Sequence, residues 1–387
     1  MRIFVLLLAL LASAFPAQAE APNKWREDAL AFPAVINTQY AYLDRLPGGR
    51  YQLTPKLQAE AESVKDDDSL LTFAERALFL LADHHAITDA SFEQSWALVP
   101  SYSDIWIERK DGRYIATSVR QQSPAELGGF KTGATLITVG GQPISDAVEA
   151  FWADLGVKQI TDDQAGYAAR ILAAGRRDRP REIVAQNVGE KSRNFVFPSL
   201  YTITRDTAPL RLIFVGKTAT IKFNDSLGGS DTIAAFDEAM AQLRPEQQLV
   251  IDLRDTASGG NTTVARAIMG WFVQKPTSYQ IHRSPAEEKQ TGIARQWVEQ
   301  VLPRATKHRK GKVTVLVGRW TGSMGEGLAI GMHSIGADVR GDRMAHLLGA
   351  TDDLTLPNTG FVFKLPTERL YSVDGSPRER FVPKSGL

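Results

Sequence analysis

Ser323 is the residue of this chain whose setting best suits nucleophilic chemistry. It follows an apolar run at residues 313–317 and a turn at 318–322, and a helix-like stretch begins directly after it. The first turn of a helix has unpaired backbone N–H groups and the positive end of the helix dipole, which stabilise developing negative charge. A serine held there could attack a carbonyl group. Capping is the alternative role, because serine is a preferred N-cap residue and Glu326 three positions later would complete a capping box.

A second strand-to-helix turn carries a pair of glycines. Asp252, Leu253 and Arg254 end an apolar run, and Gly259-Gly260 leads into a helix-like stretch at residues 262–272. Paired glycines let the backbone approach a ligand closely and turn N–H groups outward. Such a turn also serves plain packing, so by itself it indicates a site only moderately. Two converging turns would supply two donors to one oxyanion.

The first 19 residues have the pattern of a signal peptide. An almost wholly apolar run at residues 3–15 follows Arg2, and Ala17-Gln18-Ala19 is a small-x-small cleavage pattern. We expect the mature chain to begin at Glu20 and to be periplasmic or secreted. No later segment reaches the roughly 18 apolar residues of a transmembrane helix, so we expect no stable membrane insertion. The chain has no cysteine, which excludes disulfides and a thiol nucleophile.

Composition and motif spacing argue against several classes of partner. The 387 residues include 45 basic and 44 acidic side chains, a formal net charge of +1, so no global field favours nucleic acid. No histidine or carboxylate group has metal-ligand spacing, and the adjacent His84 and His85 would face different directions. The glycine pairs at 140–141 and 228–229 lack the phosphate-loop lysine and the dinucleotide fingerprint. We therefore expect no metal and no cofactor.

The pattern of apolar residues divides the mature chain into three regions. Residues 20–100 include a helical pattern over 54–98, with one broad apolar face. Residues 101–180 contain short strands and turns, including a hairpin turn at Asp111-Gly112. Residues 181–387 alternate apolar strands with amphipathic helices, which predicts an α/β domain with a mostly buried sheet. The strands expected in that domain cover residues 218–223, 249–253, 313–317 and 361–365, and the helices cover 231–243, 262–272 and 324–334.

The middle region, about residues 101–179, resembles a PDZ domain. Its elements follow the order strand, Ser123-Pro124-Ala125, short helix, glycine stop, strand and turn. One departure is Gly133-Ala134, where the pattern usually has Gly-Asp. The resemblance implies a groove that takes an extended polypeptide, often its C-terminus, as an added strand. A small β domain with only a packing role is the alternative.

Taken together, the two turns and the order of the regions resemble the tail-specific or C-terminal processing protease family. The likeness covers about residues 54–383 and rests on Asp252-Leu253-Arg254, Gly259-Gly260 and Ser323-Met324-Gly325-Glu326. It implies an N-terminal helical region, a PDZ domain and a crotonase-like (ClpP-like) catalytic domain that cleaves polypeptides through an acyl-enzyme. Ser323 would be the nucleophile. The oxyanion hole would combine the Met324 N–H with that of Gly260 or Gly259.

The chain departs from this family at the general base. Many members carry a lysine beyond the nucleophile helix, but the matching stretch, residues 341–350, has none. The tricorn-like branch uses a histidine from the helical region instead, and Asp83-His84-His85-Ala86 resembles its pattern. The resemblance therefore implies His85 as the base, for which a neutral imidazole is suited at neutral pH. His346, near the vacated lysine position, is the alternative base, and a satisfied histidine at a helix end is the alternative role for His85.

The same branch places a glutamate near the C-terminus that helps to hold the catalytic group or the bound peptide. By position Glu379 is the candidate, although its spacing to Pro383 departs from the pattern. Two functions follow from these residues. The first is an exported serine endopeptidase acting on polypeptides; the alternative is a non-catalytic peptide- or ligand-binding protein on the same fold. The sequence does not determine the oligomeric state.

Overall fold

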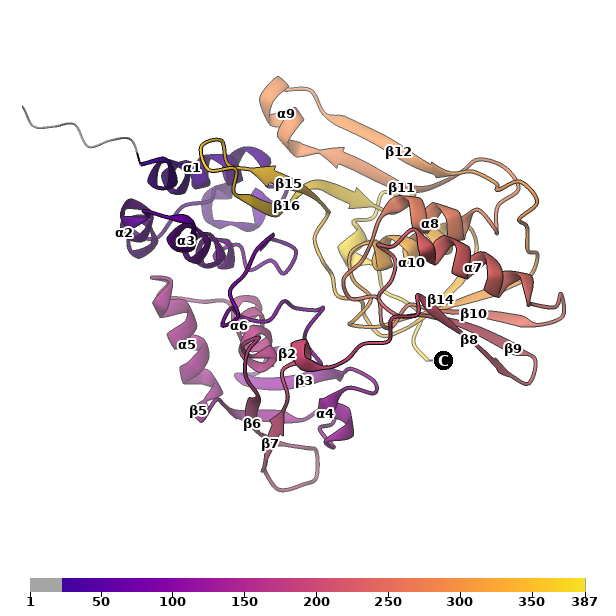
Figure 1. Cartoon of the computed structure of the whole chain (residues 1–387), viewed down its shortest axis with the longest axis horizontal. Coiled ribbons are helices and arrows are strands. Elements are labelled where there is room, and N and C mark those ends of the chain that lie inside the picture. Colours follow the sequence, from indigo (N-terminus) through magenta and orange to yellow (C-terminus); the bar gives the residue numbers. More distant parts are fainter. Residues whose placement is uncertain (1–22, 387) are drawn as a thin grey trace, which may run out of the picture.

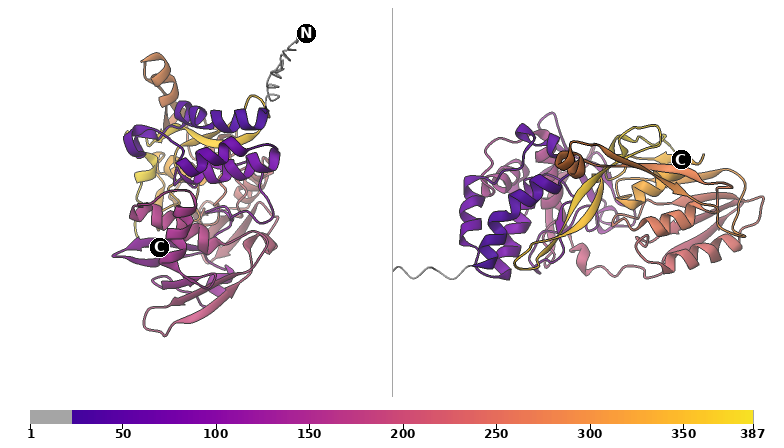
Figure 2. Two further views of the ribbon diagram at one scale, coloured as in Figure 1. Left: turned by 90° about the vertical axis from the view of Figure 1, so that its left-hand side faces the viewer. Right: turned by 90° about the horizontal axis from the view of Figure 1, so that it is seen from above.

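The computed structural model describes residues 23–386, so the expected signal peptide lies outside the described residues. Figures 1 and 2 show three parts: N-terminal helices, a β-rich unit and a larger α/β unit. Three sheets run through them, two of five strands and one of six. Within the described residues, no helix is both long and apolar enough to cross a membrane.

The N-terminal helices pack through a shared apolar core. Their side chains Phe32, Leu70 and Phe73 are fully buried in it. Each helix has a side-chain cap: Asn23 accepts backbone N–H bonds at the start of the first, Thr54 at the second, and Asp66 forms a capping box with Ser69 at the third. The three helices are α1 (Lys24–Gln39), α2 (Pro55–Ser63) and α3 (Asp67–Phe79).

The helical pattern expected over residues 54–98 ends earlier, at Phe79. Leu80 ends the helix, and Ala82 has a positive φ of 47°, which a continuing helix does not accommodate. The chain then turns through His84 and His85 to a two-residue strand, β1 (Ile87–Thr88). The predicted base candidate therefore stands on a loop and not on a helix.

The β-rich unit is built on the six-stranded sheet, in the order β2-β3-β4-β6-β7 with β5 beside β4. The expected hairpin turn is present, with positive φ at both Asp111 and Gly112. The expected boundary near residue 180 falls inside this sheet, because β6 pairs with β4 and β7 with β6. The elements are β2 (Ile105–Lys110), β3 (Arg113–Val119), α4 (Pro124–Leu127), β4 (Thr135–Val139), β5 (Gln142–Pro143), α5 (Ile144–Asp154), α6 (Asp162–Ala174), β6 (Arg181–Gln186) and β7 (Arg193–Phe197).

The α/β unit contains a sheet in the order β14-β13-β10-β9-β8, parallel except for the β8–β9 pair. The helices α7, α8 and α10, whose bounds are given below, lie beside this sheet (Figure 1). Buried aliphatic side chains from sheet and helices form one core, as the apolar strand runs predicted. The elements are β8 (Leu210–Val215), β9 (Thr218–Phe223), α7 (Asp231–Ala241), β10 (Gln248–Asp252), α8 (Thr262–Met269), β13 (Val313–Val317), α10 (Met324–Ser334) and β14 (Asp338–Gly341).

The remaining strands link this unit to the N-terminal helices. In Figure 1, β15 and β16 (yellow) run toward α1 and α3, and β1 pairs with β16 at Ile87 and Thr88. Phe363 and Leu365 of β16 belong to the same core as the N-terminal helices. The N-terminal helices and β16 therefore pack together, although they lie far apart in the sequence. These elements are β11 (Thr277–Ser284), α9 (Pro285–Thr291), β12 (Arg295–Val301), β15 (Ala350–Thr355), β16 (Val362–Tyr371) and the short 3-10 helix η4 (Arg378–Arg380).

Candidate active site

Ser323 stands between β13 and α10, at the junction that the sequence predicted. Its backbone has φ 49° and ψ −116°, a conformation that costs a non-glycine residue about 1–3 kcal/mol. Such strain persists only where surrounding contacts hold it, and it marks functional sites more often than plain caps. The Ser323 N–H donates to Glu326 Oε2 at 3.0 Å, so the glutamate supplies its half of the expected capping box.

The glycine turn packs directly against this serine. A Cβ on Gly259 would lie 2.4 Å from the Ser323 Cβ, and Gly259 also has a positive φ of 72°. From the other side, a Cβ on Gly325 would lie 2.5 Å from Thr256 Oγ1. The two turns are joined by the Thr256 N–H, which donates to the Trp320 carbonyl at 2.9 Å. Glycines on both turns therefore permit a backbone approach that no larger residue allows.

His85 lies against Ser323 although 238 residues separate the two in sequence. Its Nε2 is 3.0 Å from Ser323 Oγ, and its Nδ1 is 2.7 Å from the Leu348 carbonyl oxygen. A carbonyl oxygen only accepts hydrogen bonds, so Nδ1 carries the proton and donates it to Leu348. Nε2 is then the acceptor, and Ser323 Oγ–H donates to it. This is the arrangement of a nucleophile and its general base, with a third group orienting the base.

Burial, together with the positive charge of Arg378, lowers the pKa of His85 to about 4, although the Leu348 hydrogen bond opposes the shift. The imidazole is therefore neutral at neutral pH, the form that accepts a proton. The same environment makes the imidazolium formed during reaction costly. His85 is therefore ready to accept a proton at neutral pH, but burial and the charge of Arg378 oppose the positive charge that it gains in doing so.

Neighbouring side chains fix the loop that presents His85. Asp83 is buried, accepts the His85 backbone N–H at 2.9 Å and accepts the Tyr40 hydroxyl at 2.8 Å. On the other side, Arg170 of α6 donates through Nε to His84 Nε2 at 2.9 Å. Burial and the charge of Arg170 hold the pKa of His84 well below its usual range, so His84 is neutral. The N-terminal helices and the β-rich unit thus both support this loop.

In the described part of the chain, two backbone N–H groups near Ser323 have no hydrogen-bond partner. The N–H groups of Met324 and Gly260 make no hydrogen bond within residues 23–386. The Gly259 N–H instead donates to the Thr256 carbonyl at 3.2 Å. Of the two glycines that the sequence left open, Gly260 is therefore the one with a free donor.

A comparison with family models finds the part of this site around Ser323 inside a known family domain. Residues 217–381 match the model described as peptidase family S41. This segment is a peptidase family S41 domain. With it, the chain is a serine-type peptidase, and the resemblance to the tail-specific protease family is confirmed. The matched residues include Ser323 and the Gly259-Gly260 turn but not His85, so the choice of the histidine-using branch stays a prediction.

Solved structures share the fold over nearly the whole chain. The chain is similar to the photosystem II D1 C-terminal processing protease, with 15% sequence identity and a TM-score of 0.54, over 94% of this chain and 92% of that chain. It is also similar to mature CPAF, with 12% identity and a TM-score of 0.57, over 94% and 92% of the two chains. These identities show a common fold and no more. No curated protein matched the chain.

Glu326 connects Ser323 to the segment that contains Leu348. Its fully buried carboxylate accepts the N–H groups of Ser323, His346 and Leu347, each at 3.0 Å. Burial raises the pKa of this carboxyl to about 7, although Arg378 and the three N–H bonds oppose the rise. The charge state of Glu326 therefore changes near neutral pH, and with it the number of N–H groups that the carboxyl can accept.

Arg378 holds the same segment from the carbonyl side. Its Nη2 donates to Leu347 O at 2.7 Å and to Gly349 O at 2.8 Å, and its Nη1 donates to Ser323 O at 3.4 Å. The sequence analysis did not single out Arg378 or the Leu348 carbonyl. A backbone carbonyl has no sequence signal. The only hint for Arg378 was its place beside Glu379.

The alternative base His346 makes no hydrogen bond to Ser323 within the described residues. Its N–H bonds Glu326, its ring Nε2 is buried without a partner, and burial lowers the pKa of the ring to about 4. Glu379 makes no hydrogen bond to His85 within residues 23–386, and its buried Oε2 has no partner. Within the described residues, His85 is thus hydrogen-bonded to Ser323, whereas neither His346 nor Glu379 is hydrogen-bonded to Ser323 or to His85.

The β-rich unit contacts the turn before Ser323 through hydrogen bonds and an ion pair. Trp320 Nε1 donates to Ser103 O at 2.7 Å, and Arg319 pairs with Glu108 of β2 at 2.5 Å while its guanidinium lies 5.0 Å from the Trp106 ring. The guanidinium of Arg170 lies 4.9 Å from the same ring. One indole is therefore in contact with the arginine that holds His84 and the arginine four residues before the nucleophile.

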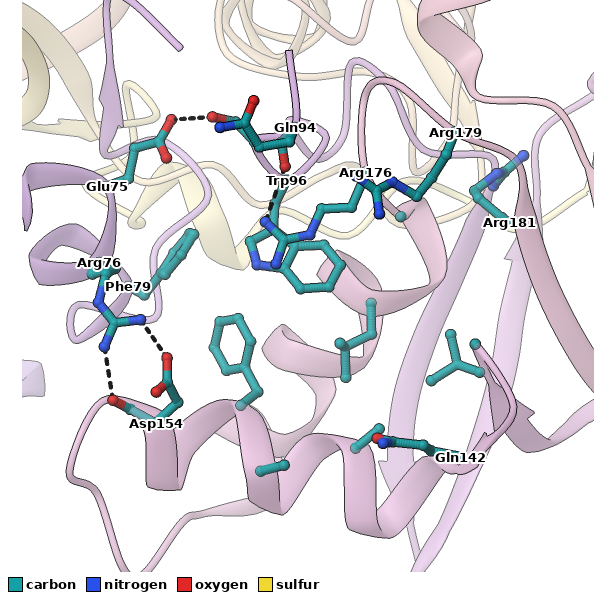
Figure 3. A pocket seen from close by; sticks show the side chains of 18 of the residues that line it. Glu75, Arg76, Phe79, Gln94, Trp96, Gln142, Asp154, Arg176, Arg179 and Arg181 are labelled. Atoms are coloured by element: carbon teal, nitrogen blue, oxygen red, sulfur yellow. Dashed lines mark hydrogen bonds and ion pairs between the residues drawn. The ribbon is translucent and has the colours of Figure 1, made fainter. Parts of the chain in front are cut away.

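Figure 3 shows a separate cavity of about 870 Å³ between α3 and α5. Phe79, Phe151 and Trp96 line its apolar part, and Arg176 lies over the Trp96 ring at 3.7 Å. Neither Ser323 nor His85 lines it. In residues 23–386, no cluster of three or more histidine, aspartate or glutamate side chains is arranged to hold a metal ion.

Proposed function

We propose that the chain is an exported serine endopeptidase that cleaves polypeptides through an acyl-enzyme on Ser323. The observation that carries this proposal is the hydrogen-bonded series Ser323 Oγ, His85 Nε2, His85 Nδ1 and Leu348 O. It couples a serine hydroxyl to a neutral imidazole whose other nitrogen is already engaged. The alternative, a non-catalytic binder, rested on the missing lysine. A histidine hydrogen-bonded to Ser323 can serve as general base in place of that lysine, which supports the catalytic proposal.

In the proposed reaction, Ser323 Oγ attacks the scissile carbonyl carbon as its proton passes to His85 Nε2. The carbonyl oxygen becomes an oxyanion that accepts N–H bonds from Met324 and Gly260. Collapse breaks the C–N bond, and the imidazolium returns its proton to the leaving amine. Water then attacks the acyl carbon as its proton passes to His85 Nε2. Collapse breaks the bond between that carbon and Ser323 Oγ, His85 returns the proton to Oγ, and the new C-terminal carboxylic acid leaves. General-base transfer contributes about 10²–10⁴-fold and each oxyanion donor about 10²–10³-fold.

The resemblance implied that Glu379 holds either the catalytic group or the bound peptide, and we propose that it holds the bound peptide. Both ring nitrogens of His85 are engaged, one with Leu348 and one with Ser323, which leaves none for Glu379 to hold. The proposed oxyanion hole is Met324 with Gly260, and Gly259 has the spatial role of letting Ser323 approach. His346 is proposed to act outside proton transfer.

We propose that the S41 domain is crotonase-like and that the β-rich unit, about residues 101–197, is PDZ-like and binds polypeptide. The outer edge of β2 is closed by α6, since Arg170 Nη1 donates to Ile107 O at 2.8 Å. Addition of a peptide strand there requires α6 to move. The cavity in Figure 3 lies between this unit and α3, and there Arg176 suits a C-terminal carboxylate and the aromatic side chains suit an apolar residue. Labelled peptides with free and amidated C-termini test this, with Arg176→Ala as the variant.

Export is proposed from the leader pattern in residues 1–19. Fractionation of cells that express the full chain tests it, and a chain that retains those residues in the cytoplasm would contradict it. The catalytic proposal is tested with a fluorophosphonate probe on the purified mature chain. Wild type should form an adduct on Ser323 and Ser323→Ala should form none. Wild type without an adduct, while peptide binding persists in Ser323→Ala, would return the non-catalytic binder.

A further inference from the structure

Arg378 is a buried cation with an unusual set of partners. It is 3% exposed, and within the described residues it forms no ion pair with a carboxylate. Its hydrogen-bond partners are three backbone carbonyl oxygens, and its Nε has none. Burying a guanidinium without a hydrogen-bonded carboxylate is costly, although the buried Glu326 carboxyl lies close enough for the two charges to attract. A residue kept in such a place has a reason beyond packing.

The three carbonyls mark what Arg378 holds. Leu347 and Gly349 lie on either side of Leu348, and their oxygens both accept from Nη2. The carbonyl between them, Leu348 O, accepts the His85 Nδ1–H at 2.7 Å. The third carbonyl belongs to Ser323 itself. One planar guanidinium therefore spans the nucleophile and both neighbours of the group that orients the base.

The held segment needs such support. His346 has a positive φ of 57°, which is unfavourable for a residue with a side chain, and Gly349 has a φ of 55°. Glu326 fixes the N–H groups of His346 and Leu347, while Arg378 fixes the carbonyls that follow. Without the arginine, the Leu348 peptide is free to rotate, and His85 loses the acceptor that keeps its proton on Nδ1.

Electrostatics alone would argue against an arginine here. Its charge lowers the pKa of His85 and so opposes formation of the imidazolium. Arg378 of η4 is the charged group that acts on the imidazole, while Asp83 of its own loop accepts the His85 backbone N–H. If Arg378 acted only through its charge, its neutralisation would make His85 a better base. A positioning role predicts the opposite sign.

Resting on the proposed function, we infer that Arg378 is a positioning residue of the active site. By bridging Ser323 O, Leu347 O and Gly349 O, it holds the Leu348 carbonyl toward His85 Nδ1 and thereby keeps Nε2 free for the Ser323 proton.

The test is the second-order rate constant for modification of Ser323 by a fluorophosphonate in the purified mature chain. Arg378→Lys keeps the charge but not the planar fork, and Arg378→Met removes both. A misplacement of about 1 Å lowers rates by about 10²-fold, so we expect both variants to label 10- to 100-fold more slowly. Guanidinium ion added to Arg378→Ala should restore part of the rate. Arg380→Met, an exposed arginine on the same short helix, is the matched control and should label like wild type.

The outcomes separate this inference from the proposed function. Absence of labelling in wild type defeats the function itself. Labelling of wild type together with an unchanged or faster rate in Arg378→Met overturns the positioning role and leaves the function standing. If the variants do not fold, as judged by circular dichroism, ¹⁵N-histidine NMR of wild type decides: His85 must carry its proton on Nδ1, and the Nε2–H tautomer overturns the inference.

Discussion

The nucleophile and the base of the proposed site are built in opposite ways. Ser323 is held by its own neighbourhood in the S41 domain: a strand, a turn and a helix within about 20 consecutive residues, packed on the glycine turn. His85 is held by groups 238 and 263 residues away, at Ser323 and Leu348. The nucleophile turn belongs to one fold, while the base depends on how the N-terminal helices dock. A peptidase built in this way can lose its base without losing the shape of its nucleophile turn.

The strongest way to break this comparison is to exchange the base candidates. His85→Ala should lower peptide turnover and fluorophosphonate labelling by about 10³-fold or more, within the range of removing a general base that works with a serine. His346→Ala should change labelling by less than about 10-fold, because its ring makes no hydrogen bond to Ser323. A larger loss of labelling in His346→Ala than in His85→Ala would place the base in the S41 domain, the same domain as Ser323, and would contradict the comparison.

The nucleophile half is tested through its glycines. Gly259→Ala places a Cβ 2.4 Å from the Ser323 Cβ at a positive φ, so we expect about 10²-fold slower labelling, as for a misplaced reacting group. Thermal unfolding should begin at a lower temperature. Gly228→Ala is the matched control on the facing loop, since the nearest atom to its Cβ lies at 4.0 Å. Equal labelling of both variants would show that the close approach at Gly259 does not matter.

The pH profile should distinguish Glu326 from His85. Burial raises the pKa of Glu326 to about 7, so lowering the pH through 7 protonates it and weakens its hold on the Ser323, His346 and Leu347 N–H groups. Labelling should therefore decline below about pH 7. His85 is protonated only near pH 4, so in Glu326→Gln the decline should shift toward pH 4 from a lower plateau.

Glu238→Gln, on the exposed face of α7, is the control and should keep the wild-type profile. An unshifted acid limb in Glu326→Gln would assign that limb to another group. For the folding equilibrium the sign is opposite to that of labelling. The folded state holds the Glu326 proton more tightly than the unfolded chain does. The free energy of unfolding should therefore decrease as the pH increases from the ordinary pKa of a glutamate to about 7.

The smallest effect is expected from removing one of the several side-chain contacts between the β-rich unit and the S41 domain. Ser118 Oγ donates to Asp342 Oδ2 at 2.6 Å, and Ser118→Ala removes that bond. Because Trp320 and Arg319 keep the nucleophile turn attached to the same unit, labelling should stay within about twofold and stability should fall by about 1 kcal/mol or less. A larger loss of labelling would mean that the bonds of Trp320 and Arg319 do not hold the turn without the Ser118–Asp342 bond.

Local patterns predicted the nucleophile half well. The helix expected at residues 324–334 is α10 with the same bounds, and the strands expected at 218–223 and 313–317 are β9 and β13. The glycines were noticed because only a residue without a Cβ lets two backbones approach so closely. Patterns failed after Phe79, where apolar residues at helical spacing continue through Leu80 and Leu81 but the backbone turns at Ala82. Tertiary contacts override the apolar pattern there.

By itself, the sequence determined the strand-turn-helix setting of Ser323, the glycine turn and the family of residues 217–381, because these depend on contacts among near neighbours. The histidine that meets Ser323, the choice of Gly260 over Gly259 as a free donor, and the roles of Leu348 and Arg378 were decided only by the tertiary structure. The physical reason is that the His85–Ser323 contact requires separate domains to dock, and the other roles rest on backbone carbonyl and N–H groups, which every residue carries alike. Their use depends on which segments the docked units bring within hydrogen-bond distance.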